Sequence, residues 1–411
     1  MGRFFFLAIL AVALLSCSGA PEAPAGDTVP EAVDARALHD RMLTFDAEMD
    51  YPPDFMEGAK DAGTETSLQI DLPKMDRGGL DGALFVVWMV TGERDEAGYT
   101  TAMEAADHQM AAFEKMITAY PERIGLARSA DEAEALVAAG RHFAVAGMVN
   151  AYQLGPDLSA LDTWYERGLR NITLTHVGHN QFADSSRPGR GLPPEEHGGL
   201  SDLGRELIAR MNRLGVIVDV SQVTAKVVME VTENSTAPVI ASHSGVKAIV
   251  DSPRNLTDEE MIAIKDTGGL VGIVAFSSYL KKSDPERRPA LLKIEETYGS
   301  STLADVMADR PDQVGQFQAD MAAHEERFPR ANVGHLVNSI DYAVQLIGID
   351  HVAISSDMEH GGGVTGWMNA GEAFGVTEEL VRRGYSEADI AQLWWGNFAR
   401  VWRAVEAAAG G

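Results

Sequence analysis

Short apolar segments alternate with longer amphipathic segments from about residue 39 to the end of the chain. The short segments have the length and the uninterrupted apolar character of strands that are buried on both faces of a parallel sheet. The longer segments carry apolar residues at helical spacing, and several begin with an N-capping side chain, as at Ser129, Ser201 and Thr257. The predicted strands are residues 42–45, 83–90, 143–148, 172–175, 216–220, 239–241, 270–276 and 352–355.

Eight strands that alternate with helices predict a fold of the α/β class, a closed (β/α)₈ barrel rather than an open sheet. We expect residues 39–411 to form this one domain. Residues 283–330, between the seventh and eighth predicted strands, are polar and contain four prolines. The segment is too long for a simple crossover, so we interpret it as an insertion that forms a lid or a subunit contact. A homodimer is therefore one assembly to consider.

The N-terminus predicts export. Arg3 precedes twelve apolar residues at 4–15, and a helix of that length rises only about 18 Å, too short to cross a bilayer. Residues 1–16 are therefore predicted to be a signal peptide. Cys17, the only cysteine, follows Leu-Leu-Ser, which resembles the bacterial lipoprotein processing box and implies acylation of Cys17. Ordinary signal cleavage beside an incidental cysteine is the alternative.

Residues 17–38 are rich in Ala, Pro, Gly and acidic residues and predict a flexible tether. An exported protein on such a tether is expected to lie in the bacterial cell envelope, with its lipid as its only membrane contact. The chain of 411 residues has 61 acidic and 34 basic side chains, a net charge of −27. This excess argues against nucleic acid as a partner. One cysteine also excludes zinc sites built from several thiolates.

Polar residues recur where the predicted strands end, and in a barrel these ends meet at one mouth. Any one of them can be explained as a helix cap or a core residue, but together they form an O/N set that suits a divalent cation. They include Asp46, Glu48, Asp50, Asn150, His176, Asp219, Gln222, His243 and Asp357. The other histidines lack this placement and are interpreted as surface or structural residues: His39, His108, His142, His179, His197, His324, His335, His351 and His360.

Several ordered motifs together resemble the membrane (renal-type) dipeptidase family of metallopeptidases. They are LTFDAEMDYP at 43–52, YERGLRNITLTH at 165–176, VDVSQ at 218–222, VIASHS at 239–244, ISSD at 354–357 and GNFARVW at 396–402. The resemblance covers about residues 40 to 405. It implies a (β/α)₈ barrel with a two-zinc centre that hydrolyses dipeptides and, in some members, related small amides or lactones.

The match to the family's metal ligands is incomplete. Asp50 is retained, but Glu48 stands where the family has a histidine. The glutamate that bridges the two metals falls at Val149, and the first of the two histidines of the second metal falls at Gln222, while the second is retained as His243. The loss of the bridge argues against a pair of ions, and an amide oxygen is a weaker zinc ligand than imidazole.

We therefore expect one zinc ion rather than two, with no metal as a further alternative. Its predicted ligands are Glu48, Asp50, His243 and Asp357, with Gln222 as a doubtful addition, and the prediction requires these residues to converge at one rim.

The resemblance also implies roles for three further positions. His176 matches the residue that polarises the substrate or stabilises the oxyanion, and Arg254 matches the clamp for the substrate's C-terminal carboxylate. Asp357 matches the carboxylate that takes the proton of the attacking water. We expect a hydrolase that cleaves dipeptides or similar small amides with a metal-activated water. The alternative is a catalytically impaired barrel that binds a peptide-like ligand or a protein partner.

Overall fold

The computed structural model describes residues 34–189, 191–300, 306–307 and 309–409. The predicted signal peptide, Cys17 and most of the predicted tether lie outside these residues. Residues Ala35–Gly411 form one compact unit. Helix α1 (Ala35–His39) begins inside the segment that we predicted as tether, and Leu38 and His39 are buried. The last four residues of that segment therefore belong to the folded unit, because an apolar side chain there packs into the core.

Eight parallel strands form the centre of the fold, in the order β1-β2-β4-β5-β6-β7-β9-β10. Backbone contacts just past the end of β10 join it to β1: Asp50 N–H donates to the Met358 carbonyl at 3.2 Å, and Asp357 N–H donates to the Glu48 carbonyl at 3.3 Å. The predicted (β/α)₈ barrel is thereby confirmed. The strands are β1 (Phe45–Asp50), β2 (Gly82–Trp88), β4 (His142–Val149), β5 (Leu169–Thr173), β6 (Ile217–Asp219), β7 (Val239–Val246), β9 (Leu270–Val274) and β10 (Val352–Ser355).

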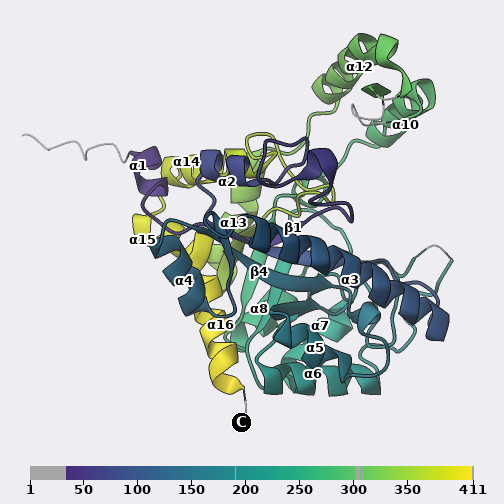
Figure 1. Cartoon of the computed structure of the whole chain (residues 1–411), viewed down its shortest axis with the longest axis vertical. Helices are drawn as coiled ribbons and strands as arrows, with labels where there is room; N and C mark the ends of the chain where they lie inside the picture. Colours follow the sequence, from purple (N-terminus) through teal and green to yellow (C-terminus); the bar gives the residue numbers. More distant parts are fainter. Residues whose placement is uncertain (1–33, 190, 301–305, 308, 410–411) are drawn as a thin grey trace, which may run out of the picture. The chain divides into compact units, whose positions relative to one another are not determined.

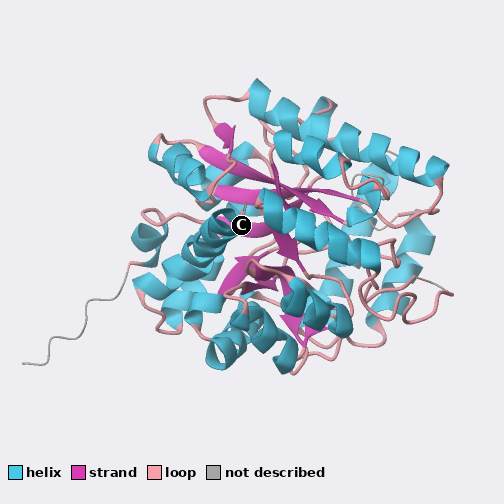
Figure 2. Cartoon of the chain, turned by 90° about the horizontal axis from the view of Figure 1, so that it is seen from below, coloured by secondary structure: helices cyan, strands magenta, loops and turns pink. Residues whose placement is uncertain are grey.

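Helices surround the strands, as the view in Figure 2 shows. The predicted caps form: Ser129, Ser201 and Thr257 each accept a hydrogen bond from a backbone N–H of the first helical turn. None of the described helices is long and apolar enough to cross a membrane. The helices are α2 (Leu72–Gly78), α3 (Glu96–Ala119), α4 (Ala130–Ala138), α5 (Ala160–Glu166), α6 (Asp202–Leu214), α7 (Ala225–Asn234), α8 (Asp258–Asp266), α13 (Val333–Ile347), α14 (Phe374–Arg382), α15 (Glu387–Ala391) and α16 (Asn397–Ala408).

The first strand lies further along the chain than its hydropathy predicts. We expected residues 42–45, whereas β1 spans Phe45–Asp50 and includes three acidic residues. The pairing with β2 is irregular between Asp46 and Met49, and beyond this irregularity Glu48 and Asp50 stand on either side of Met49 and share one face of the strand. That face points into the barrel mouth, where the charged side chains serve the site. Because these residues are polar, a strand prediction based on apolar runs ends before them. Two short strands were also not predicted, β3 (Ile124–Leu126) beside β4 and β8 (Asn255–Leu256) beside β7.

Between the last two barrel strands, α9 (Ser277–Leu280) precedes the predicted insertion at 283–330, which contains α10 (Arg287–Tyr298) and α12 (Val314–Arg327). Helices α10 and α12 pack against each other (Figure 1). Tyr298, Val306 and Phe317 form a small hydrophobic cluster between them, separate from the two clusters of the barrel. The insertion thus has a core of its own.

Candidate metal centre and substrate cavity

Three carboxylates meet at the mouth of the barrel. Glu48 and Asp50 come from β1, and Asp357 follows β10, the neighbouring strand. One oxygen from each lies within 4.8 Å of the others, and all three residues are buried. Glu48 Oε2 has no hydrogen-bond partner among the described residues. Three buried anions with an unsatisfied oxygen fit a divalent cation, which prefers such oxygen ligands.

Burial raises the pKa of each of these carboxyl groups. The pKa of Asp357 rises to about 7, although the nearby positive charges of Arg254 and Arg187 act in the opposite direction. The pKa values of Glu48 and Asp50 lie well above the ordinary range, because burial is reinforced by repulsion between the neighbouring carboxylates. The protein alone does not neutralise this group of charges.

His243 does not belong to this carboxylate group. Its Nδ1 donates to Ser242 Oγ at 2.7 Å, and Ser242 Oγ donates to Asp219 Oδ2 at 2.5 Å. Its Nε2 accepts a hydrogen bond from the amide nitrogen of Gln222 at 3.0 Å, and the Gln222 amide oxygen accepts from Arg187. Both ring nitrogens of His243 are therefore engaged, and burial lowers the pKa of the ring well below its usual value.

These contacts argue against a second metal ion. The lone pair that His243 would offer is taken by Gln222, and the aliphatic side chain of Val149 lines the cavity where the family pattern has a carboxylate. Arg187, a permanent cation, lies at the end of this hydrogen-bonded chain. The residues present fit one divalent ion on the carboxylates and do not fit a pair.

Two arginines provide positive charge at the cavity. Arg254 is 4% exposed, donates through Nη2 to the His243 carbonyl at 3.0 Å and lies 5.4 Å from the centre of the Tyr279 ring. Its Nε and Nη1, and the Nε of Arg187, have no hydrogen-bond partner among the described residues. Guanidinium groups with buried, unsatisfied N–H donors are suited to bind an anion.

Aromatic rings form another wall. His176 packs edge-on against Trp88 and His360, with ring centres 6.0 and 4.9 Å apart, and His360 Nδ1 lies 3.8 Å from Asp50 Oδ1. The Nδ1 of His176 lies 3.1 Å from the carbonyl oxygen of Met89, which can only accept, so Nδ1 carries the proton. Burial lowers the pKa of His176 to about 3. The neutral ring therefore offers an acceptor at Nε2, not the donor that an oxyanion needs.

Backbone strain marks the same mouth. Asn150, Gln222 and Asp357 follow β4, β6 and β10 and have φ angles of 81°, 72° and 57°. Such left-handed conformations are uncommon for residues other than glycine and cluster at functional sites. The Asn150 side chain is fully engaged in the structure, since its Nδ2 donates to the Met89 carbonyl at 2.9 Å and its Oδ1 accepts from the Asn180 side chain. It therefore has no free group for a ligand.

The structure brings most of the sequence-predicted site residues to one cavity of about 320 Å³, a volume that includes its open mouth. His243 and Arg254 are not among the lining residues, but each contacts one of them: His243 is hydrogen-bonded to Gln222, and Arg254 lies against the ring of Tyr279. The sequence did not single out Trp88, Arg187, Phe276 or Tyr279, and it interpreted His360 as a surface or structural residue. The structure places His360 in the lining of this cavity, and the signal for this placement was its position three residues after Asp357, at the same end of the barrel. The residues that line the cavity are Glu48, Asp50, Trp88, Val149, His176, Arg187, Gln222, Phe276, Tyr279, Asp357 and His360.

Comparison with known proteins agrees with this geometry. The model of the membrane dipeptidase family (peptidase family M19) matches residues 33–411. The chain belongs to this family. Dipeptidase tcpJ of Claviceps purpurea is 26% identical over 345 residues, which cover 82% of this chain and 69% of that protein.

Solved structures show the same barrel. The probable dipeptidase PvdM from Pseudomonas aeruginosa superposes with a TM-score of 0.80 at 38% identity and covers 91% of this chain and 98% of its own. A metallo peptidase from Rhodobacter sphaeroides, liganded with a phosphinate mimic of the dipeptide L-Ala-D-Ala, shares the fold with a TM-score of 0.69 at 21% identity, over 89% and 99% of the two chains. The function class of this membrane dipeptidase family member is that of a metal-dependent, dipeptidase-type hydrolase.

Proposed function

We propose that this member of the family hydrolyses dipeptides or similar small amides in the barrel-mouth cavity, with one divalent cation. The observation that carries the proposal is the meeting of three buried carboxylates with two incompletely paired arginines. Zinc remains the predicted ion, although a purely carboxylate set also suits Mn²⁺ or Mg²⁺. A site with groups for both a metal ion and an anionic substrate favours hydrolysis over ligand binding alone.

The charges support a single ion. The carboxylate group contributes three negative charges and the two arginines two positive ones. A divalent cation leaves one positive charge, which faces the C-terminal carboxylate of a bound dipeptide. Two divalent cations would leave three uncompensated positive charges in a buried cavity, at a high desolvation cost.

The chain's own residues then have separate tasks. Glu48, Asp50 and Asp357 would hold the ion, and a bound divalent cation supplies a water molecule of lowered pKa. Asp357 takes a proton from that water and returns it to the leaving amine. Arg254 binds the substrate's C-terminal carboxylate through its unsatisfied N–H groups. The neutral His176 accepts a hydrogen bond from an N–H of the substrate.

The test is metal content of the purified protein, together with turnover of a dipeptide panel before and after addition of zinc or manganese. We expect close to one ion per chain and metal-dependent hydrolysis. Protein that takes up no metal and turns over no dipeptide under any of these conditions would eliminate the proposal and leave the ligand-binding alternative.

Reversion of the unusual positions provides a second test. The triple variant Val149→Glu, Gln222→His and Glu48→His restores the family pattern, so we expect a second zinc ion per chain and a higher zinc-dependent rate. An unchanged metal content in a folded triple variant would contradict our account of why only one ion binds.

We also propose that the protein is exported and anchored at the bacterial cell envelope through lipid on Cys17. The support is the sequence around that residue alone. Expression of the Cys17→Ser variant should move the protein from the membrane fraction to the soluble exported fraction, and an unchanged distribution would refute the anchor.

A further inference from the structure

Arg187 is a cation that faces the cavity without a counter-ion. Its Nη2 donates to the Gln222 amide oxygen, a neutral group, and its Nε is buried without a hydrogen-bond partner among the described residues. No carboxylate in the described parts of the chain forms an ion pair with it. A partly buried guanidinium left in this state is costly unless an anion completes its hydrogen bonds.

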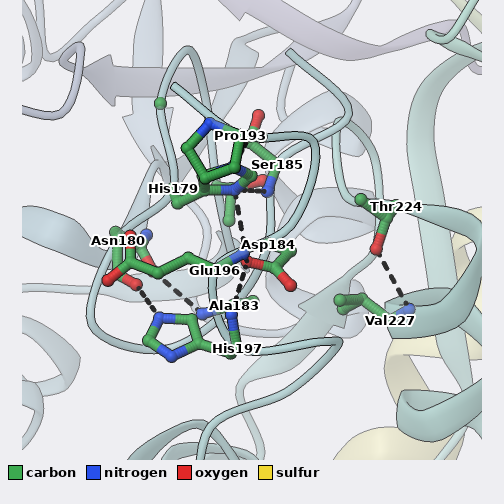
Figure 3. A network of polar contacts seen from close by, with 12 residues as sticks. His179, Asn180, Ala183, Asp184, Ser185, Pro193, Glu196, His197, Thr224 and Val227 are labelled. Atoms are coloured by element: carbon green, nitrogen blue, oxygen red, sulfur yellow. Dashed lines mark hydrogen bonds and ion pairs between the residues drawn. The ribbon is translucent and has the colours of Figure 1, made fainter. Parts of the chain in front are cut away.

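The backbone that carries Arg187 is held firmly. It lies in the loop between β5 and α6, which a network of polar contacts closes (Figure 3). Asp184 accepts hydrogen bonds from three backbone N–H groups within residues 196–199, at 2.8–3.1 Å, and His179 donates to the Pro193 carbonyl at 2.9 Å. Arg187 itself accepts from the N–H of Gly178 at 2.8 Å through its carbonyl. The backbone position of Arg187 is therefore fixed by hydrogen bonds on both sides of it.

The side chain is aimed by the hydrogen-bonded chain that ends on it. Asp219 accepts from Ser242, Ser242 accepts from His243, His243 accepts from Gln222, and Gln222 accepts from Arg187. Because Nδ1 of His243 carries the proton, its Nε2 can only accept, so the amide nitrogen of Gln222 must face the histidine and the amide oxygen faces the arginine. Through this series of hydrogen bonds, the buried carboxylate of Asp219 fixes the orientation of the Arg187 guanidinium.

The cavity places Arg187 among the reacting groups. It lines the same hollow as the carboxylate group and His176. His176 presents an acceptor and Arg254 is assigned to the terminal carboxylate, so neither provides a donor for a negative oxygen at the scissile carbonyl. Such a donor is usually among the largest contributions to acyl-transfer catalysis.

We infer that Arg187 binds the oxygen that becomes negative when water adds to the scissile carbonyl, at the place where a second cation does not fit. The inference rests on the proposed function. In this step the water oxygen forms a bond to the carbonyl carbon, the carbonyl π electrons move to its oxygen, and Asp357 takes the proton. The oxyanion then returns its electrons to carbon, the C–N bond breaks, and the proton goes to the leaving amine. Arg187 is thus a catalytic residue that contacts the substrate.

The test compares binding of two probes to the metal-loaded protein by calorimetry. One is a phosphinate dipeptide mimic, which is a tetrahedral anion. The other is a slowly hydrolysed dipeptide with the same side chains, whose carbonyl is neutral. We expect Arg187→Met to weaken phosphinate binding about 100-fold or more and dipeptide binding less than about fivefold. Where the reaction is measurable, kcat should fall about 100-fold with KM nearly unchanged.

Two further variants and the metal content complete the design. Arg187→Gln serves if Arg187→Met unfolds, and Arg213→Met, an exposed arginine of α6, is the matched control that should leave both probes unaffected. Metal content should stay at one ion per chain in all variants.

The outcomes separate the two proposals. Equal weakening of both probes would show that Arg187 binds an unreactive part of the substrate and would overturn the inference while hydrolysis stands. Wild-type protein that does not bind the phosphinate would overturn it as well. Wild-type protein that binds the phosphinate through Arg187 but never turns over a dipeptide would support the oxyanion site and reject the proposed hydrolysis.

Discussion

Replacement of Asp357 by asparagine should stabilise the metal-free protein at neutral and alkaline pH. Asp357 is 7% exposed, belongs to the carboxylate group and has a φ of 57°. Asparagine keeps the shape of the side chain and is one of the few residues that tolerates this left-handed conformation. Its amide can also donate hydrogen bonds to Glu48 and Asp50. The substitution therefore removes a buried negative charge with little other disturbance.

The magnitude follows from the pKa of Asp357. Its folded-state value of about 7 lies above the unfolded value of 3.8, so the folded protein binds the extra proton and its stability is lost as pH rises through 7. Each pKa unit corresponds to about 1.4 kcal/mol, which gives about 4 kcal/mol at pH 8. The same relation gives about 2 kcal/mol at pH 5 and less than about 1 kcal/mol at pH 4, where the folded carboxyl is protonated and the unfolded one partly so.

The assay is urea denaturation of wild type and Asp357→Asn in chelator at pH 4, 5 and 8. We expect the variant to unfold at higher urea at pH 8, with a gap that closes toward pH 4. Zinc or manganese should stabilise wild type and not the variant, and dipeptide turnover should fall about 100-fold or more. Asp266→Asn, whose parent side chain is 64% exposed, should change the unfolding free energy by less than about 0.5 kcal/mol. A metal-free variant that is no more stable than wild type at pH 8 would refute this electrostatic reasoning.

Two other predictions concern the scaffold. His39 is buried, accepts a hydrogen bond from the Thr377 hydroxyl and donates one to the Gly78 carbonyl of α2. Burial lowers the pKa of His39. Below pH 6.5 the unfolded state therefore binds the extra proton, and the free energy of unfolding falls. His39→Gln should flatten the pH dependence between 6.5 and 5 by up to about 1.4 kcal/mol per pH unit in urea melts, and an equally steep variant would contradict this. Gly272→Ala would place a Cβ 1.9 Å from the Ser242 carbonyl in the neighbouring strand and should cost about 3 kcal/mol, whereas Gly315→Ala, with nothing within 4 Å, should cost nothing; equal melting temperatures of the two would count against it.

The barrel itself was predictable because its information is local. Buried parallel strands are apolar on both faces, and helices repeat their apolar residues at helical spacing. Both patterns can therefore be read directly from the linear sequence. β10 was predicted with its observed bounds, 352–355. β1 was not, because its functional carboxylates interrupt the apolar pattern inside the strand. The insertion was likewise visible as a polar segment of excessive length, whereas its separate hydrophobic cluster was not.

Local patterns in the sequence are sufficient to predict the fold, the family pattern and the convergence of Glu48, Asp50 and Asp357 at one end of the barrel, since parallel strands end at the same rim. The contacts of the remaining polar groups are visible in the folded protein alone. Gln222 and His243 could have faced a metal ion, but each found a hydrogen-bond partner in the other, and Arg187 entered from a loop whose course no periodic pattern encodes. The positions of strands and helices follow from short-range patterns in the sequence. The hydrogen-bond partner of a given side chain depends instead on distances between residues that lie far apart in the chain.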